Sequence, residues 1–330
     1  MLIRFFRSGF FIQHFSIVVV ALLLWLPVFV GQNKSIVFDG FHPFFDVFQP
    51  LFNNQTVIGL VFLLLFFLVI SFFFGRIVSE GGFQLRTGTH GMLLFVLMAG
   101  PFYLSTGFSP WLASLPFVLA TMYHMLAFYN SKNLPFTVFY ASFYSGLAVL
   151  FHLPNVLLFP VVFLSLIVAR AHVFKLWIVP FGGFLAPFFF LSVYFFLTDT
   201  LLLQWEEFLM AAVGSSFSFQ IVSVADVIQA AILIILTVVS FFWILGPSAD
   251  NSIIMRKRTS ILLFLFLALG PLHFLTQEAR LGSGLMWIVP IIFVAGFFSH
   301  TKNIRWANIA LLVLLLSAIG QQYIDYLWAY

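Results

Sequence analysis

The sequence predicts an all-α fold, a polytopic bundle of transmembrane helices, and two observations support this prediction. Of the 330 residues, 63% are hydrophobic and only 7% are charged, with a mean hydropathy of +1.13, whereas a soluble domain carries about 25% charged residues. A soluble fold of this size could not cover so much apolar surface, but lipid removes the need to do so. The 49 Phe and 8 Trp residues are typical of a lipid-facing surface with aromatic belts at the interfaces.

Eleven hydrophobic segments approach the length that a spanning helix needs, which is about 20 residues, or fewer where polar ends reach the interface. We therefore expect about eleven spans in a single integral membrane domain that covers residues 1–330. The predicted spans are Phe15–Val30, Val57–Phe74, Met92–Ser105, Trp111–Phe128, Phe136–Phe151, Asn155–Ala169, Leu176–Leu197, Val227–Leu245, Ile261–Leu275, Met286–Phe298 and Ala307–Ile319.

The charged residues favour both this number of spans and one orientation. With the N-terminus in the cytoplasm, every Lys and Arg except Lys34 and Arg280 falls in a cytoplasmic segment. The positive-inside rule describes this bias, and an odd number of spans places the C-terminus outside. Eight of the ten acidic residues fall on the outer face. They either keep the outer loops soluble or mark that face as the place of chemistry or ion binding.

Composition and charge spacing exclude several function classes. The basic residues occur singly or in short groups between hydrophobic runs, so the net charge of +4 does not indicate nucleic-acid binding. The chain has no Cys, which excludes disulfides, thiolate metal sites and cysteine nucleophiles. No helix centre carries an unambiguous Asp, Glu, Lys or Arg, which argues against an ion-coupled transporter.

Two outer loops, residues 31–56 and 198–226, are longer than a connection needs. In the first loop, Pro43–Phe52 reads PFFDVFQPLF, which indicates a short helix lying in the membrane interface. The second loop also has the character of an interfacial segment. Its Glu206 and Glu207 form either a solvated acidic turn or a further acid or metal ligand.

One predicted helix, Leu176–Leu197, contains two Pro and two Gly residues. Gly182 and Ala186 have the spacing of small residues that lets helices approach closely. This pattern predicts either a packed, kinked helix or a functional hinge.

Candidate catalytic residues follow the first helix on the outer face. Asp39 and His42 are close enough in sequence to share a proton or a divalent ion, although two ligands do not make a metal site. The alternative is a hydrated loop. Asp46 lies in the interfacial stretch, where it either adds an acid or forms the polar face of the helix.

A second candidate site lies where the ninth predicted helix meets the outer surface, and it contains His273, Glu278 and Arg280. A guanidinium beside a membrane can hold a lipid-linked phosphate through paired hydrogen bonds. Arg280 is the candidate for this role, because a basic residue on the outer face runs against the general bias. Glu278 would orient it. The alternative is a surface ion pair between Glu278 and Arg280.

Five sequence stretches carry a resemblance to other proteins. The chain begins MLIRFFRS, continues through ALLLWLP, and contains FYNSKN, SGLAVLFHLP and FGGFLAPFFFL between Met125 and Thr200. In these stretches it resembles an uncharacterised family of bacterial multi-pass membrane proteins. The resemblance implies a place in the bacterial cytoplasmic (inner) membrane and brings no activity with it.

The layout also resembles the GT-C class of membrane glycosyltransferases, which take a sugar from a polyprenyl-phosphate donor. Asp39 and Pro43–Phe52 match the catalytic acid and the interfacial helix of that class, and Glu278-Ala279-Arg280 is similar to its Glu-x-Arg motif. The resemblance implies that Asp39 is the base or metal ligand and that Arg280 contacts the phosphate. The chain departs from the class because Gly40 stands where a second acid is usual.

The sequence-based hypothesis is a GT-C-like glycosyltransferase that uses a polyprenyl-phosphate-linked sugar at the outer face of the membrane. Its expected partner is membrane lipid, and a divalent metal is the cofactor that its acids suggest. Two alternatives stay open: a non-enzymatic membrane subunit of an envelope assembly or secretion complex, and a lipid or solute transporter that moves through Leu176–Leu197.

Overall fold

The computed structural model describes most of the chain. The described residues are 2–7, 9–30, 44–45, 57–84, 88–106, 108–170, 173–213, 224–245, 253–275, 285–301 and 304–328. Over these ranges every regular element is a helix, as the composition predicts.

The described helices range from a five-residue turn at the N-terminus to stretches of more than twenty residues. In chain order they are α1 (Leu2–Phe6), α2 (Phe11–Val30), α4 (Val57–Glu80), α5 (His90–Thr106), α6 (Pro110–Ala127), α7 (Leu134–Phe151), the 3-10 helix η2 (Leu153–Leu157), α8 (Leu158–Val168), α9 (Lys175–Leu197), α10 (Leu201–Val213), α11 (Val224–Leu245), α12 (Ile253–Leu275), α13 (Ile288–His300) and α14 (Ile304–Trp328).

Ten of the eleven hydrophobic segments predicted from the sequence coincide with one helix to within a few residues at one end or both, and Asn155–Ala169 is divided between η2 and α8. Three helices, α4, α7 and α9, are long and apolar enough to cross a membrane. The other apolar helical stretches among the described residues are shorter. The total of eleven spans and their orientation therefore stay predictions.

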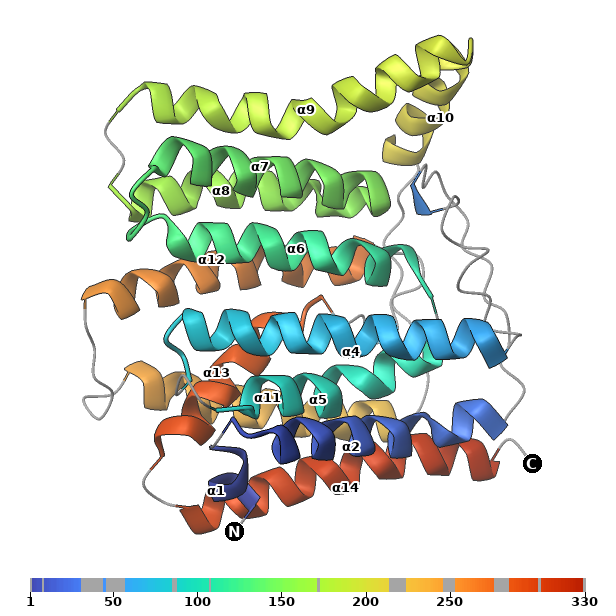
Figure 1. The fold of residues 1–330 in the computed structure, drawn as a ribbon, viewed down its shortest axis with the longest axis vertical. Coiled ribbons are helices and arrows are strands. Elements are labelled where there is room, and N and C mark those ends of the chain that lie inside the picture. Colours follow the sequence, from blue (N-terminus) through green and yellow to red (C-terminus); the bar gives the residue numbers. More distant parts are fainter. Residues whose placement is uncertain are drawn as a thin grey trace.

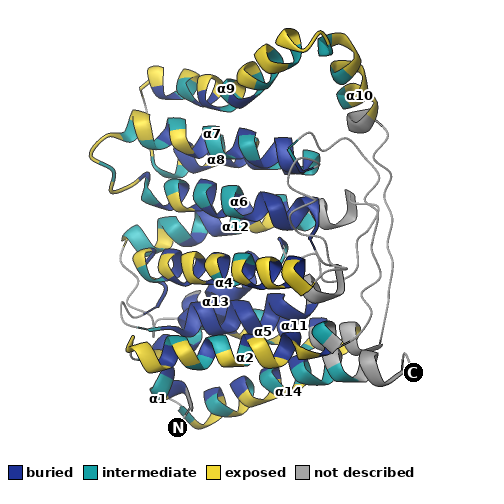
Figure 2. Cartoon of the chain, turned by 45° about the vertical axis from the view of Figure 1, so that its right-hand side comes forward, coloured by how far each residue is buried: buried dark blue, intermediate teal, exposed yellow. Residues whose placement is uncertain are grey.

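The long helices lie roughly parallel to one another and are stacked from α9 on one side to α14 on the other (Figure 1). The most buried helices are α5 and α13, whose described side chains are almost all buried (Figure 2). Helix α5 packs against α2, α4, α13 and α14, and α13 packs against α11 as well. By contrast α9 and α10 are largely exposed (Figure 2), which suits a surface that meets lipid.

Charged side chains gather at the two ends of these helices rather than along them. The end that holds the N-terminus and α1 carries the described basic residues, in helix ends and turns (Figure 1). The opposite end carries α10 (Figure 1) and three acids, Asp199, Glu206 and Glu207. The basic residues are Arg4, Arg7, Arg76, Lys132, Arg170, Lys175, Arg256, Lys257, Arg258 and Arg305.

The close contact between α7 and α9 corrects one prediction. Gly182 was expected to face a neighbouring helix, but a Cβ atom added there would have no atom within 4 Å. Gly183 makes the contact instead, because a Cβ there would lie 2.6 Å from the carbonyl oxygen of Phe139 on α7. Gly146 on α7 is equally close to the backbone of α9. The small residues therefore serve close packing, one position away from the predicted face.

Helix α1 is held at the N-terminal end of the bundle by polar contacts. Arg7, which follows it, donates from Nη2 to the carbonyl oxygens of Thr301 at 2.8 Å and Phe298 at 3.3 Å. The backbone N–H of Thr89 donates to the carbonyl of Phe6 at 2.9 Å. These bonds satisfy carbonyls at helix ends, which would otherwise lack partners.

Candidate functional site

Most of the sequence-predicted site residues lie outside the described residues. These are Asp39, His42, Asp46, Glu278 and Arg280. His273 belongs to the end of α12, but its side chain is also outside the described part. Their roles and separations therefore remain predictions.

Two aromatic residues between His42 and Asp46 are described, and both pack against the helical bundle. The ring of Phe45 stacks on Phe108, before α6, at a centroid distance of 5.1 Å. Phe44 stacks on Phe151, the last residue of α7, at 5.6 Å. Phe45 is only 1% exposed, so its stacking is a core contact. This part of the predicted interfacial stretch is attached to the ends of α6 and α7.

Glu206 and Glu207 are exposed on α10. Gln204 donates from Nε2 to Glu207 Oε2 at 3.3 Å, which is a weak surface contact. Helix α10 is attached to α9 through Phe208, whose ring meets Phe188 edge-on at 6.1 Å. Across the described residues, no group of three or more His, Asp or Glu side chains is placed to hold a metal ion.

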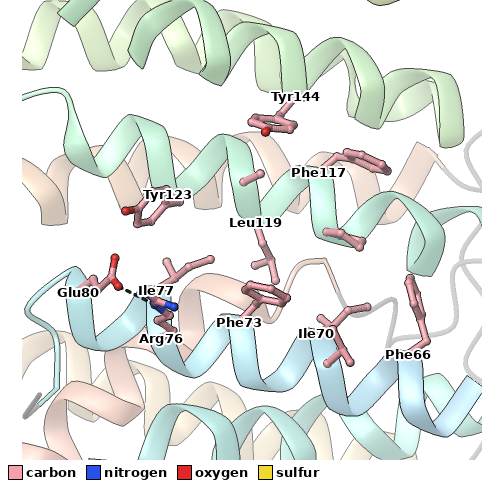
Figure 3. Close-up of a pocket in the computed structure, with 13 residues that line it drawn as sticks. Phe66, Ile70, Phe73, Arg76, Ile77, Glu80, Phe117, Leu119, Tyr123 and Tyr144 are labelled. Carbon is pink, nitrogen blue, oxygen red and sulfur yellow. Dashed lines mark hydrogen bonds and ion pairs between the residues drawn. The ribbon is translucent and has the colours of Figure 1, made fainter. Parts of the chain in front are cut away.

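A groove lies between α4 and α6, with Tyr144 of α7 at its side (Figure 3). Its volume is about 530 Å³, within the range of about 300–1,000 Å³ that is usual for ligand pockets. The α4 wall consists of Phe66, Val69, Ile70, Phe73, Arg76, Ile77 and Glu80. The α6 wall consists of Pro116, Phe117, Leu119, Ala120 and Tyr123.

The groove exists because α4 presents a continuous seam that α6 does not fill. Phe66, Ile70, Phe73, Ile77 and Glu80 are spaced alternately four and three residues apart, which is the spacing of a helix-packing seam. The facing side of α6 carries two small residues, Pro116 and Ala120, one turn apart. Neither reaches far across the gap, so a space remains between the helices.

The two ends of the groove differ in chemistry. At the end near α1, Arg76 Nε donates to Glu80 Oε1 at 2.8 Å. The Tyr123 hydroxyl of α6 lies beside Glu80 on the opposite wall (Figure 3). At the other end the lining rings are Phe66 and Phe117. The groove is therefore apolar along its length and charged at one mouth.

The aromatic end of the groove continues into the rings on which Phe44 and Phe45 stack. Phe66 meets Phe108 edge-on at 6.2 Å, and Phe117 stacks on Phe151 at 5.1 Å. Phe108 and Phe151 are the two residues on which Phe45 and Phe44 stack. One set of aromatic contacts thus connects the groove to the segment that precedes Asp46.

Sequence reasoning missed this groove, although its signal was present. The seam on α4 ends in Arg76 and Glu80, one helical turn apart and therefore on one face. Two charges at the end of an apolar seam indicate a polar mouth. The space between α6 and α4 depends on tertiary packing, so it could not have been predicted from Pro116 and Ala120 alone.

The chain matches no family model, no curated protein and no solved structure with which it was compared. The resemblances noted in the sequence therefore stay predictions.

Proposed function

We propose that this chain is a multi-pass protein of the bacterial cytoplasmic membrane, with eleven spans and a cytoplasmic N-terminus. Two features support the proposal. Three of its helices have the length and composition of spans, and the described basic residues lie at the N-terminal end of the bundle. That separation of charge follows the positive-inside rule, with the basic end in the cytoplasm.

Within that membrane, the activity we propose is that of a GT-C-like glycosyltransferase with a polyprenyl-phosphate-linked sugar as donor. The observation that supports it is the attachment of Phe44 and Phe45 to the ends of α6 and α7. A catalytic loop must be held in position against a rigid scaffold. The segment between His42 and Asp46 is held in this way, at the end of the bundle proposed to face outward.

In the proposed reaction, Asp39 accepts the proton of an acceptor hydroxyl, with His42 as the second candidate catalytic residue. If the reaction used a divalent metal, Asp39 would be one of its ligands and the ion would supply Lewis acidity. The acceptor oxygen attacks the anomeric carbon of the sugar, and the bond from that carbon to the lipid-phosphate oxygen breaks. Arg280 stabilises the departing phosphate through charge-assisted hydrogen bonds, and Glu278 and His273 orient the Arg280 side chain.

The test is sugar transfer in isolated membranes, with a panel of polyprenyl-phosphate monosaccharides that carry a radiolabelled sugar. Asp39→Asn and Arg280→Ala are expected to abolish transfer while insertion into the membrane stays normal. Lys132→Ala, which removes an exposed charge from the opposite end, is the matched control and should transfer at the wild-type rate. Normal transfer by both Asp39→Asn and Arg280→Ala would refute the mechanism.

Orientation has a separate test, because the absence of Cys allows single-cysteine labelling. Glu206→Cys on α10 is expected to react with a membrane-impermeant maleimide in intact spheroplasts. Lys132→Cys, in the turn between α6 and α7, is expected to react only after the membrane is permeabilised. Both residues are exposed, so a reversed pattern would refute the orientation rather than report burial.

A further inference from the structure

We propose that the groove between α4 and α6 is a binding site for one phospholipid of the inner leaflet, a zwitterionic aminophospholipid with its headgroup at Arg76 and Glu80. The inference rests on the membrane location and orientation proposed above, and not on transferase activity.

The apolar part of the groove has the shape of an acyl-chain site. From Phe66 to Glu80 the α4 seam extends about 21 Å, at 1.5 Å per residue, while one leaflet accounts for about half of the roughly 30 Å hydrocarbon core. A chain that enters at the inner mouth thus passes through one leaflet and reaches the aromatic rings beyond its end. The floor is apolar and well covered, with Ile70 and Leu119 each 2% exposed.

An empty groove of this size is unfavourable inside a membrane. Its walls would lose dispersion contacts on one side, and the lining offers too little polarity to hold a row of ordered waters. Lipid chains are as apolar as the walls, so burial alone gives little preference for one lipid over another. Selection must therefore come from the mouth.

The mouth carries both signs of charge in positions open to a ligand. The side chains of Arg76 and Glu80 are 65% and 38% exposed although they are paired with each other. A phosphate can take paired hydrogen bonds from the guanidinium, and a primary ammonium can donate to the carboxylate. Tyr123 adds a hydroxyl beside Glu80 on the facing wall. A zwitterionic headgroup can contact all three groups together, with its phosphate at Arg76 and its ammonium at Glu80.

Other headgroups fit the charged mouth of the groove less well. An anionic headgroup without an amine would compete with Glu80 for Arg76 and would place its phosphate beside that carboxylate without bringing a second cation. A trimethylammonium headgroup has the right charge but no N–H to donate to Glu80. The expected order of retention is phosphatidylethanolamine first, then phosphatidylcholine, then phosphatidylglycerol.

The experiment uses the full chain, reconstituted into phosphatidylcholine vesicles that contain equal amounts of phosphatidylethanolamine and phosphatidylglycerol. After extraction in a mild detergent, the phospholipids that remain with the protein are quantified by mass spectrometry. We expect one retained phosphatidylethanolamine per chain, enriched about tenfold over phosphatidylglycerol, as one charge-assisted contact allows. Equal retention of the two lipids, or preference for phosphatidylglycerol, would overturn the proposal.

Two variants distinguish lipid bound in the groove from lipid bound elsewhere on the lipid-facing surface. Ala120→Phe fills the groove and should lose the retained lipid, whereas Ala231→Phe, on an exposed face of α11, should keep it. Lipid retained equally by both would refute the site.

Charge variants test the mouth and do not depend on the fold tolerating a bulky residue. Glu80→Gln should remove the preference for phosphatidylethanolamine while a lipid is still retained. Arg76→Gln should reduce retention about tenfold, and Arg305→Gln, an exposed arginine of α14 at the same end, should not. Unchanged selectivity in Glu80→Gln and unchanged retention in Arg76→Gln would refute the headgroup assignment. Cysteine labelling tests the membrane orientation without depending on lipid binding, so the proposed orientation and the proposed lipid site can be refuted separately.

Discussion

The adjacent glycines of α9 allow close helix packing to be tested with a matched pair of substitutions. Gly182→Ala and Gly183→Ala add the same methyl group to neighbouring positions of one helix. At Gly183 the added Cβ would lie 2.6 Å from the carbonyl oxygen of Phe139 and 3.0 Å from Ser142 Cβ. The first of these is a backbone atom, so α7 and α9 would have to move apart. At Gly182 no atom lies within 4 Å.

The magnitude follows from two opposing effects. Replacing Gly by Ala in a helix stabilises it by about 0.5–1 kcal/mol, and this gain is common to both variants. Overpacking destabilises by about 1–3 kcal/mol, and only Gly183→Ala has it. The difference between the two variants therefore isolates the clash, and we expect Gly183→Ala to be about 1–3 kcal/mol less stable than Gly182→Ala.

The assay is thermal or SDS-induced unfolding of the purified protein in detergent, with both variants measured under the same conditions. Gly182→Ala should unfold at or slightly above the wild-type midpoint, and Gly183→Ala clearly below it. Gly146→Ala on α7 should behave like Gly183→Ala, because its Cβ would lie 2.5 Å from the carbonyl oxygen of Phe184. Equal midpoints for Gly182→Ala and Gly183→Ala would show that this contact is not tight.

Two further predictions concern arginines that hold helix ends together. Arg258 donates to the carbonyls of Gly81 at 2.7 Å and Leu126 at 3.3 Å. Arg258→Ala should therefore destabilise the fold by about 2–3 kcal/mol in the same unfolding assay. The control Arg256→Ala, at an exposed neighbouring position, should stay within about 0.5 kcal/mol of wild type. Arg7→Ala removes two of the bonds that hold α1, so limited proteolysis should cut the N-terminal segment faster than in the wild type. The exposed Arg4→Ala should leave that rate unchanged, and no difference between these two variants would contradict the role of Arg7.

The helix positions could be predicted from the sequence because length and hydropathy act locally. A run of about 20 apolar residues in lipid must satisfy its own backbone hydrogen bonds, and a helix does so within the segment. This reasoning located α9 and α4 well. It placed the ends less well, because α12 begins at Ile253 and includes three basic residues ahead of the predicted span. Charged residues at a helix end reach the interface and do not interrupt the helix.

Contacts between helices could not be predicted in the same way. Gly182 and Gly183 are neighbours in sequence, yet only one of them faces α7, since the rotation of α9 about its axis depends on how it packs. The groove also depends on how the helices pack. The α4 seam is visible in the sequence, but the space between α4 and α6 is not. For the candidate catalytic residues, chemical roles could be predicted from the sequence. Their positions stay untested, because Asp39 and Arg280 lie outside the described residues.

The two proposals meet at the aromatic rings between the groove and the first outer loop. Phe66 and Phe117 line the groove and contact Phe108 and Phe151, on which Phe45 and Phe44 stack. A lipid chain that reaches this end would pack against these rings, which reduces their freedom to move. Binding effects of this kind are reciprocal. If lipid in the groove strengthens donor binding, then a bound donor must strengthen lipid retention by the same factor. Two independent sites would leave retention unchanged when donor is added.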